Sequence, residues 1–256
     1  MTGLTRPTTG VVITGGASGI GRASARALAE VGRPVALWDV DAALAAGVAK
    51  EIADEFGVAT CSVGLDVRES ERFPASIAAS REALGSIGGL VHSAGVSHPV
   101  PIDELDEESW DLVLNVNLRS YALLAKALLS ELRSHPGSAI VGIASINAIL
   151  GNGANPAYSA SKAGLLAVTR SLADGLAADG IRVNAICPGY IRTPMQDAPM
   201  ANVPGLEQAY ERQSMLGRMG EPEEIGRVVR FLLSEEASFI TAEHVIVDGG
   251  VVPSQR

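Results

Sequence analysis

The chain has 256 residues, of which 47% are hydrophobic and 19% are charged, so it can bury the core of one large α/β domain or at most two small ones. Its formal net charge of −9 argues against a nucleic-acid partner, because binding to phosphates requires a basic surface. No run of about twenty apolar residues is present, which argues against an integral membrane protein.

The sequence further predicts a cytoplasmic protein. Residues Met1 to Gly10 are polar and lack the apolar stretch of a signal peptide. The two cysteines, Cys61 and Cys187, lie far apart and do not require pairing, which favours a reduced, intracellular compartment. No cluster of His, Cys and Asp residues has the spacing of metal ligands, so we expect no catalytic metal.

Short β-branched runs alternate with longer Ala- and Leu-rich stretches of helical period, such as 21–31, 42–56, 109–135 and 158–178. This alternation is typical of βαβ units and a parallel sheet, whose strands are apolar throughout because both faces are buried. No Pro/Ser-rich linker divides the chain, so we expect a single domain over residues 1–256. The seven predicted strands are 11–14, 34–38, 59–63, 90–92, 138–143, 182–186 and 244–247.

A glycine loop joins the first predicted strand to the first predicted helix. Its glycines, Gly15, Gly19 and Gly21, permit a tight turn and let the backbone approach a pyrophosphate. The helix that follows offers free N–H groups at its first turn, to which phosphates bind. Together with Ser18 and Ile20, these residues form the predicted phosphate site of a dinucleotide.

Two acidic residues follow strands at places where a dinucleotide is bound. Asp39 ends the second strand, where a carboxylate binds the ribose 2′-hydroxyl and repels a 2′-phosphate. No Lys or Arg lies among the loop glycines or directly after Asp39, so NAD is favoured over NADP; the alternative is an exposed Asp in a strand-end turn. Asp66 either accepts a hydrogen bond from the adenine amino group or caps a helix near Arg68 and Glu69.

The least regular segment runs from Pro188 to Gly220. Its prolines predict a loop with at most short helices, and a loop of this length in a compact domain is often a lid over a ligand. Flexible apolar side chains suit either a closing surface over an apolar ligand or ordinary filling under a loop. Four of the five methionines lie here: Met195, Met200, Met215 and Met219.

Tyr158 and Lys162 lie four residues apart and therefore share one face of a helix. A free tyrosine has a pKa of about 10, which is too high for a base at neutral pH. A neighbouring ammonium favours the phenolate and lowers that pKa. The pair makes Tyr158 a candidate acid/base, although the same spacing also occurs in ordinary surface helices.

The tyrosine–lysine pair and the glycine loop together resemble the short-chain dehydrogenase/reductase family. The resemblance covers residues 9–250 and implies a doubly wound Rossmann fold, with a mostly parallel sheet in the order 3-2-1-4-5-6-7 and helices on both faces. Further family motifs occur in the family's order: Asp66-Val67, Ser93-Ala94-Gly95, Asn117-Leu118, Ser145, Pro188-Gly189 and Val247-Asp248-Gly249-Gly250.

The resemblance also implies the roles of four residues. Tyr158 exchanges the substrate proton, and Lys162 binds the nicotinamide ribose and lowers the pKa of Tyr158. Ser145 holds the substrate oxygen, and Asn117 keeps a water behind Lys162. By themselves, Ser145 would be read as a strand-end serine and Asn117 as a polar residue that bends a helix.

Other cofactor and substrate contacts are expected around these groups. The backbone near Ile191 and the side chain of Thr193 are placed by the resemblance beside the carboxamide. We predict substrate contacts at Asn147, Asn155, Tyr190 and Met195, and possible lining by His98. The remaining expected cofactor contacts are Val67, Ala94, Gly95, Pro188 and Gly189.

The sequence departs from the family pattern in two neighbouring strands. His92 stands where the family has Asn, and Gly142 stands where the family has a second Asn. We expect the larger His92 ring to occupy the space opened at Gly142. We interpret His92 as a hydrogen-bonded core histidine, since the acid/base role is already filled by Tyr158.

The predicted activity is reversible NAD-dependent oxidation of a secondary alcohol with a hydrophobic body, such as a steroid-like, terpenoid or aryl alcohol. One alternative is reduction of a 3-oxoacyl thioester, which usually takes NADPH in this family; another is a non-catalytic NAD-binding regulator, which would not need Tyr158. Family members pair their long helices between subunits. We therefore expect a homotetramer through 109–135 and 158–178, with a dimer as the alternative.

Overall fold

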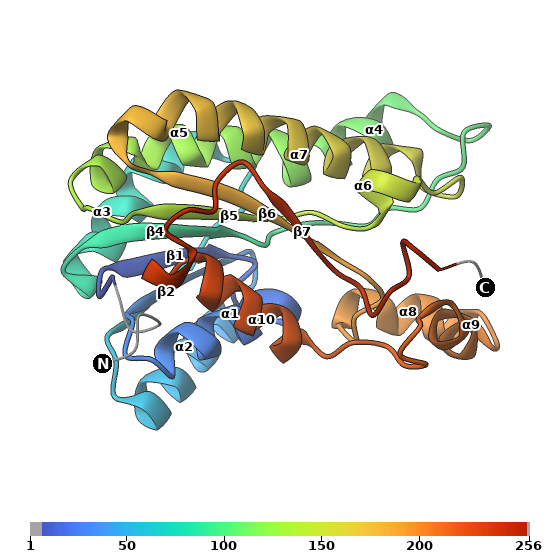
Figure 1. Cartoon of the computed structure of the whole chain (residues 1–256), viewed down its shortest axis with the longest axis horizontal. Helices are drawn as coiled ribbons and strands as arrows, with labels where there is room; N and C mark the ends of the chain where they lie inside the picture. Colours follow the sequence, from blue (N-terminus) through green and yellow to red (C-terminus); the bar gives the residue numbers. More distant parts are fainter. Residues whose placement is uncertain (1–6, 255–256) are drawn as a thin grey trace.

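A parallel sheet runs through the centre of the computed structural model, which describes residues 7–254 (Figure 1). The strand order is β3-β2-β1-β4-β5-β6-β7, and every neighbouring pair is parallel. The predicted doubly wound Rossmann fold is therefore confirmed, and each predicted strand is present. The strands are β1 (Gly10–Thr14), β2 (Val35–Asp39), β3 (Thr60–Gly64), β4 (Ile87–His92), β5 (Ala139–Ile143), β6 (Arg182–Pro188) and β7 (His244–Val247).

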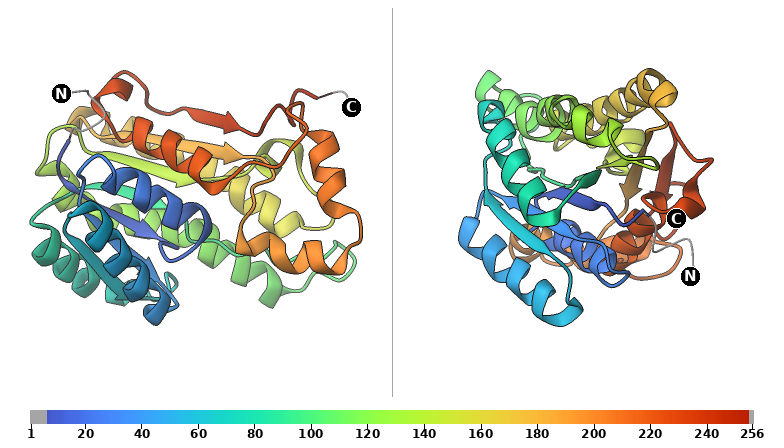
Figure 2. Two further views of the ribbon diagram at one scale, coloured as in Figure 1. Left: turned by 90° about the horizontal axis from the view of Figure 1, so that it is seen from below. Right: turned by 90° about the vertical axis from the view of Figure 1, so that its left-hand side faces the viewer.

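Two layers of helices cover the sheet (Figures 1 and 2). One layer contains α1 (Gly19–Ala29), α2 (Ala42–Phe56) and α10 (Pro222–Leu232), and the other contains α3 (Phe73–Leu84), α5 (Ser120–Arg133) and α7 (Pro156–Leu176). Each layer packs against its own cluster of Val, Leu and Ile side chains from the strands. The central strands β1, β4 and β5 are buried along their whole length, which explains their uninterrupted apolar sequences.

The long helix predicted over 109–135 is built from three segments. The helix α4 (Glu107–Leu114) leads into a π-helical stretch, η3 (Asn115–Arg119), and then into α5. Within the described chain, 107–133 is the one helix that is long and apolar enough to cross a membrane, with a hydropathy of 1.3, and 44% of that window is buried. A core helix passes the same test, so this is weak evidence for a membrane span.

Short elements gather beyond the carboxyl ends of the strands. They include α6 (Asn147–Leu150), α8 (Pro194–Asn202) and α9 (Leu206–Gln213), so the predicted loop 188–220 holds two short helices. In Figure 1, α8 and α9 lie at one end of the molecule, next to the C-terminal segment. The remaining short helical turns are η2 (Ser70–Arg72), η4 (Ala177–Asp179) and η5 (Glu235–Ala237).

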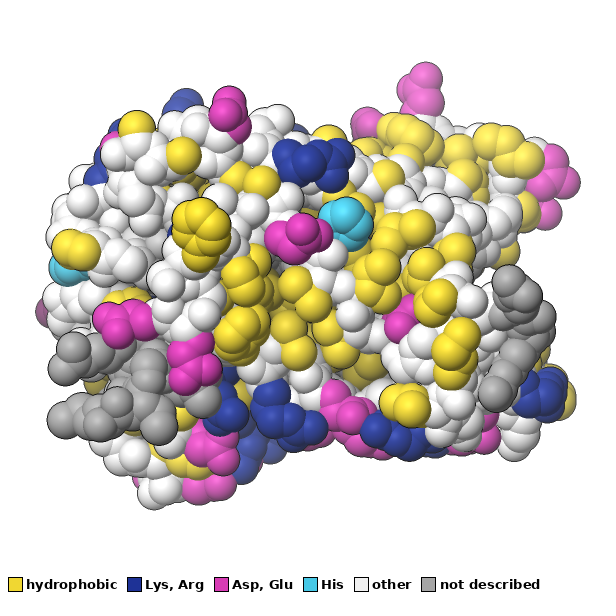
Figure 3. All heavy atoms as spheres, viewed as in Figure 1, with side chains coloured by type: hydrophobic (Ala, Val, Ile, Leu, Met, Phe, Trp, Pro, Cys, Tyr) yellow, Lys and Arg dark blue, Asp and Glu magenta, His cyan; other side chains and the backbone are white. Residues whose placement is uncertain are grey.

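Basic and acidic side chains are interspersed on the face shown in Figure 3, where hydrophobic side chains gather over the region of β7 and α10. Cys61 is partly buried, Cys187 is buried, and both are free thiols. The prediction of a cytoplasmic location drew on the polar start of the chain, of which residues 1–6 lie outside the described part.

The expected packing of His92 against Gly142 is wrong in its detail. The two residues are partners in the β4–β5 register. However, the atoms nearest to a Cβ at Gly142 belong to Leu165 and Tyr121, at 2.8 and 3.3 Å. The Tyr121 ring on α5 and the Leu165 side chain on α7 occupy this space, because these helices pack against the sheet at this position. His92 is wholly buried, as expected of a core histidine, and lies within hydrogen-bond distance of Thr14 Oγ1 and Ser120 Oγ.

Candidate active site

A cavity of about 670 Å³ opens at the carboxyl ends of the strands, at the point where the strand order reverses between β1 and β4. The residues predicted for the site line it, except Gly21, Asn117 and His98. The cavity thus joins residues from both halves of the chain. From the sequence predictions it brings together Gly15, Ser18, Gly19, Ile20, Asp39, Asp66, Val67, Ala94, Gly95, Asn147, Ser145, Asn155, Tyr158, Lys162, Pro188, Gly189, Tyr190, Ile191, Thr193 and Met195.

The glycine loop has the close packing that a dinucleotide site requires. Gly15 has a φ of 64°, and a Cβ there would lie 2.9 Å from the backbone of Ala94. A Cβ at Gly21 would lie 1.9 Å from the Gly15 carbonyl oxygen, so only glycine lets α1 start directly against the loop. The Ser18 side chain does not cap α1 and no acid lies in its first turn, which leaves the positive end of the helix toward the cavity. These residues fit a bound pyrophosphate.

Asp39 is held in place at the end of β2. Its Oδ2 accepts a hydrogen bond from the Ala17 backbone N–H at 3.0 Å, and its Oδ1 accepts one from the Asp41 N–H at 3.1 Å. Each oxygen has a second lone pair available for a ligand in the cavity. The carboxylate is therefore held by one backbone donor of the glycine loop and one of the turn after β2.

Asp66 forms a local ion pair that sequence reasoning left open. Its carboxylate accepts hydrogen bonds from the Arg68 backbone N–H and from the Arg68 guanidinium, at distances down to 2.6 Å. This bonding lowers the pKa of Asp66. Asp66 closes a turn rather than capping a helix, and Arg68 joins it in lining the cavity. Arg68 was not predicted as a site residue, because an arginine in a charged turn has no distinguishing sequence signal.

Tyr158, Lys162 and Ser145 meet on the other side of the cavity. Asn155 caps α7 by accepting from the Tyr158 N–H at 3.3 Å, and Pro156 begins the helix. Lys162 Nζ lies 5.5 Å from the centroid of the Tyr158 ring and donates to the Ile143 carbonyl at 2.8 Å. Ser145 follows β5, and its Oγ accepts from the Asn147 N–H at 3.1 Å.

Burial governs the electrostatics of the pair. Desolvation lowers the pKa of Lys162 to about 8. Burial raises the pKa of Tyr158, and a hydrogen bond with Ser145 opposes this. The chain by itself does not produce the lowered Tyr158 pKa that the resemblance implies, because desolvation of the phenolate outweighs the favourable hydrogen bond.

Asn117 lies in the π-helical stretch and is wholly buried. Its Oδ1 accepts from the Val96 N–H at 2.8 Å, and its Nδ2 donates to the Val96 carbonyl at 3.0 Å and to Ser161 Oγ at 3.1 Å. A Cβ at Gly95 would lie 3.4 Å from both Asn117 Oδ1 and Lys162 Nζ. Asn117 therefore holds the loop after β4 against α7, next to the lysine.

Comparison with known proteins places this geometry in a family. A family model described as enoyl-(acyl carrier protein) reductase matches residues 15–252. The chain belongs to the short-chain dehydrogenase/reductase family. It is 39% identical to cis-4-hydroxycyclohexanecarboxylate dehydrogenase of Sinomonas cyclohexanicum over 93% of this chain and 94% of that protein.

Other members of the short-chain dehydrogenase/reductase family differ in the substrates and cofactors that their names give. The 3-oxoacyl-(acyl-carrier-protein) reductase FabG of Thermotoga maritima is 34% identical over 94% of this chain and 96% of that protein. The crystal structure of L-sorbose reductase from Gluconobacter frateurii, in complex with NADPH and L-sorbose, superposes with a TM-score of 0.91 at 29% identity and covers 99% of this chain and 100% of that chain. The family thus shows an oxidoreductase that uses a nicotinamide cofactor.

The substrate side of this family member differs in part from expectation. Asn147, Asn155, Tyr190 and Met195 line the cavity, but the Asn155 side chain caps α7 and also donates to Ser97 Oγ at 3.0 Å. Its amide group is therefore already engaged in hydrogen bonds within the protein. His98 does not line the cavity, whereas Tyr210 of α9 does. No periodic or motif signal pointed to Tyr210.

Of the two interpretations of the methionines, a closing surface or ordinary filling under a loop, the structure does not show a common closing surface. Met195 is 41% exposed and lines the cavity, but Met200, Met215 and Met219 do not line it. Met219 is buried, and Met215 packs beside Gly250. Proximity in sequence did not translate into one surface, because α8, α9 and the turn after them point these side chains in different directions. Across residues 7–254, no group of three or more His, Cys, Asp and Glu side chains is arranged to hold a metal ion.

Proposed function

We propose that this chain is an NAD-linked dehydrogenase that oxidises a secondary alcohol with a hydrophobic, ring-bearing body. The observation that carries the proposal is the Asp39 carboxylate, which two backbone N–H groups hold beside the glycine loop. A fixed carboxylate there binds the ribose 2′-hydroxyl and repels a 2′-phosphate.

The cations of the cavity support the same preference. The basic side chains that line it in the described chain are Arg68 and Lys162. The Arg68 guanidinium is already paired with Asp66, and Lys162 is bonded to the Ile143 carbonyl beside the tyrosine. Neither is free to compensate a phosphate close to Asp39.

The residues of the catalytic half have complementary tasks. NAD, when bound, would supply the acceptor for the hydride that leaves the carbon carrying the hydroxyl group. Ser145 would donate a hydrogen bond to the substrate oxygen and keep its own proton, while its Oγ accepts from the Asn147 N–H. Tyr158 then removes the substrate proton, and Lys162 stabilises the phenolate and contacts the nicotinamide ribose. Asn117 fixes the loop that contains Val96 and borders Lys162.

The lining of the cavity supports a hydrophobic substrate. Its substrate end is lined by apolar side chains, including Val96, Leu112, Ile146 and Met195, with a few amides among them. A relative at 39% identity is named for cis-4-hydroxycyclohexanecarboxylate, a ring-bearing secondary alcohol that also carries a carboxylate. Sites of this composition bury an apolar body and orient it by few polar contacts.

Reduction of a 3-oxoacyl thioester is the second candidate, because a relative at 34% identity carries that name. That reaction usually uses NADPH in the family, which Asp39 disfavours. A non-catalytic regulator is the third, and the convergence of Ser145, Tyr158 and Lys162 in one cavity argues against it.

The test measures the initial rate at which reduced cofactor forms, once with NAD and once with NADP. The substrates are cyclic and aryl secondary alcohols, small charged hydroxy acids and 3-hydroxyacyl thioesters. We expect NAD and the cyclic or aryl alcohols to give kcat/KM values at least about tenfold above the others. Preference for small charged hydroxy acids would refute the substrate class. Preference for NADP with thioesters would favour the second candidate, and an inert protein that still binds NADH would favour the third.

We also propose a cytoplasmic homotetramer, with a dimer as the alternative. Partly exposed hydrophobic side chains on α5 and α7 support pairing of these helices between subunits, and Phe239 and Ile246 expose further apolar surface near β7. Sedimentation equilibrium would overturn the proposal if the protein were a monomer at micromolar concentration.

A further inference from the structure

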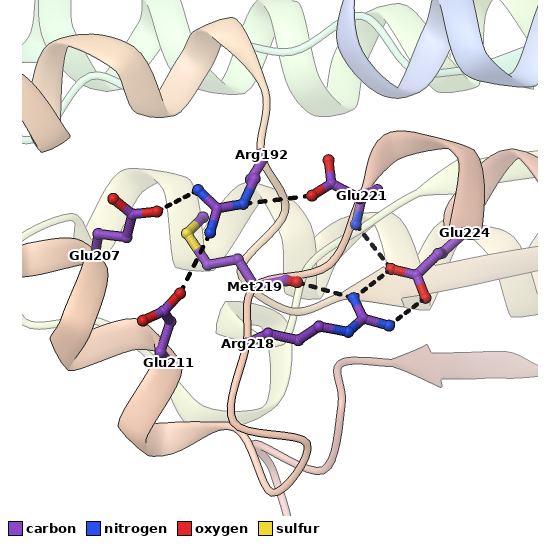
Figure 4. Close-up of polar contacts among 7 residues, drawn as sticks. All are labelled: Arg192, Glu207, Glu211, Arg218, Met219, Glu221 and Glu224. Atoms are coloured by element: carbon purple, nitrogen blue, oxygen red, sulfur yellow. Dashed lines mark hydrogen bonds and ion pairs between the residues drawn. The ribbon is translucent and has the colours of Figure 1, made fainter.

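Two residues of the turn that follows β6, Tyr190 and Arg192, contact the helix α9. The ring of Tyr190 stacks on that of Tyr210, with centroids 3.9 Å apart and planes inclined by 9°. The Tyr190 hydroxyl donates to Gln213 Oε1 at 2.8 Å. Two residues on, Arg192 pairs with Glu207 and Glu211, which lie one helical turn apart on α9 (Figure 4).

The residue between them anchors the same turn to the body of the protein. Ile191 is 6% exposed and packs in the cluster under α1 and α10. Gly220 bonds to this turn on both sides, since its N–H donates to the Tyr190 carbonyl and its carbonyl accepts from the Arg192 N–H, each at 2.9 Å. Residues 190 and 192 thus face α9, while residue 191 faces the core.

The helix α9 has little else to hold it. None of its residues is buried. Glu207 and Glu211 repel one another at this spacing unless a cation lies between them. Arg192 supplies that cation and reaches Glu221, the N-cap of α10, at 3.4 Å as well (Figure 4). One guanidinium therefore joins α9 to the first turn of α10.

Tyr210 connects the contacts between the turn after β6 and α9 to the cavity. It is a residue of α9 that lines the cavity, and its stacking partner Tyr190 lines it too. The position of α9 therefore sets where this aromatic wall stands. Ile191 and Thr193, on either side of Arg192, line the same cavity.

We propose that Arg192 is a positioning residue that holds α9, and with it the Tyr190–Tyr210 wall, over the substrate end of the cavity. This inference rests on the proposed function for its substrate, but not for the docking of α9. Loss of Arg192 leaves α9 detached for part of the time, so the alcohol binds a smaller competent fraction of the enzyme. Once the alcohol is bound, the wall is in place and the chemical step is unaffected.

Arg218 offers a matched control in the same region. Its guanidinium pairs with Glu224 at 2.7 Å and donates to the Met219 carbonyl, yet it touches no residue of α9 shown in Figure 4 and does not line the cavity. Arg218→Met removes an arginine and an ion pair from the same segment without releasing α9.

The first measurement is hydrogen–deuterium exchange of the protein without added cofactor or substrate. We expect amides of residues 206–213 to exchange about five- to tenfold faster in Arg192→Met than in the wild type, as fits the loss of several partly screened ion pairs. Arg218→Met should leave them unchanged. Unchanged exchange in Arg192→Met overturns the proposal, whether or not the chain oxidises alcohols.

The second measurement is kinetic. In Arg192→Met we expect the KM for the alcohol to rise about five- to tenfold while kcat stays within about twofold. Arg192→Lys should recover part of the loss, because an ammonium reaches fewer carboxylates at once. Tyr210→Ala should raise the KM similarly, and combining it with Arg192→Met should add little. A fall in kcat with an unchanged KM would indicate general damage and contradict the proposal.

Discussion

The imidazole ring of His92 stacks on the phenol ring of Tyr121, with centroids 5.2 Å apart and planes inclined by 29°. The Tyr121 Cζ and Oη atoms lie 3.3 and 3.4 Å from where a Cβ of Gly142 would stand. The two departures from the family pattern, at positions 92 and 142, are therefore connected through Tyr121. Its ring takes the space that a side chain at 142 would need, and His92 packs against that ring.

Acid should destabilise the protein through His92. Burial, with Lys162 nearby, lowers the pKa of His92 from 6.5 to about 3 in the folded chain. Between these pH values the unfolded chain binds the extra proton, so the free energy of unfolding falls as the pH falls. We expect His92→Asn to flatten that fall by up to about 1.4 kcal/mol per pH unit in urea titrations. A slope in His92→Asn equal to that of the wild type would contradict the assignment.

Restoring the family's residue at position 142 should destabilise this chain. A Cβ there lies 2.8 Å from Leu165 Cδ2 in addition to the Tyr121 contacts, so Gly142→Asn overpacks the core. The expected loss in the free energy of unfolding is about 1–3 kcal/mol. Gly47→Ala in α2 meets nothing within 4 Å and should instead stabilise by about 0.5–1 kcal/mol. Denaturation midpoints that move the same way in both variants would show that packing at 142 is not the cause.

Removal of the Tyr158 hydroxyl should abolish proton transfer and leave cofactor binding intact. We expect Tyr158→Phe to lower kcat/KM by about 10²–10⁴-fold, with NADH affinity within about twofold by fluorescence titration. Tyr121→Phe is the control, since it loses a buried hydrogen bond to Thr169 Oγ1 and about 1 kcal/mol of stability, but no group in the cavity. A Tyr158→Phe enzyme as active as the wild type would refute the proposed mechanism.

The Asp39 carboxylate should decide between the two cofactors. In Asp39→Ser the ribose loses its acceptor and the 2′-phosphate loses its repulsion, so the KM for NAD should rise about tenfold and that for NADP should fall. Asp41→Asn changes a neighbouring acid whose side chain caps α2 and keeps that role as an amide. It should leave both KM values unchanged. An Asp39→Ser enzyme with an unaltered preference would locate the selection elsewhere.

Local patterns in the sequence predicted much of this molecule. The alternation of β-branched runs and helical stretches predicted all seven strands, because a parallel strand must be apolar on both faces. The glycine loop and the Tyr158–Lys162 spacing are likewise local, since each depends on neighbours within one or two turns of chain. The strand order came from the family resemblance rather than from any of these patterns.

These local patterns could not predict contacts between segments that lie far apart in the sequence. The methionines of 188–220 share a segment but not a surface. The Asn155 side chain hydrogen-bonds to Ser97 and caps the start of α7. The Asp66–Arg68 pair was local, yet its place in the cavity depended on where the turn after β3 lies.

The sequence by itself determined the class of fold, the glycine loop and the placement of the candidate pair Tyr158 and Lys162 on one helix face, because these depend on backbone periodicity, on glycine and on spacing within one helical turn. Only the tertiary structure decided that Tyr121 fills the space at Gly142, that Arg192 holds the two glutamates of α9, and that Tyr210 stands in the cavity wall. Each of these depends on packing between elements separated along the chain, whose side-chain directions no periodicity specifies.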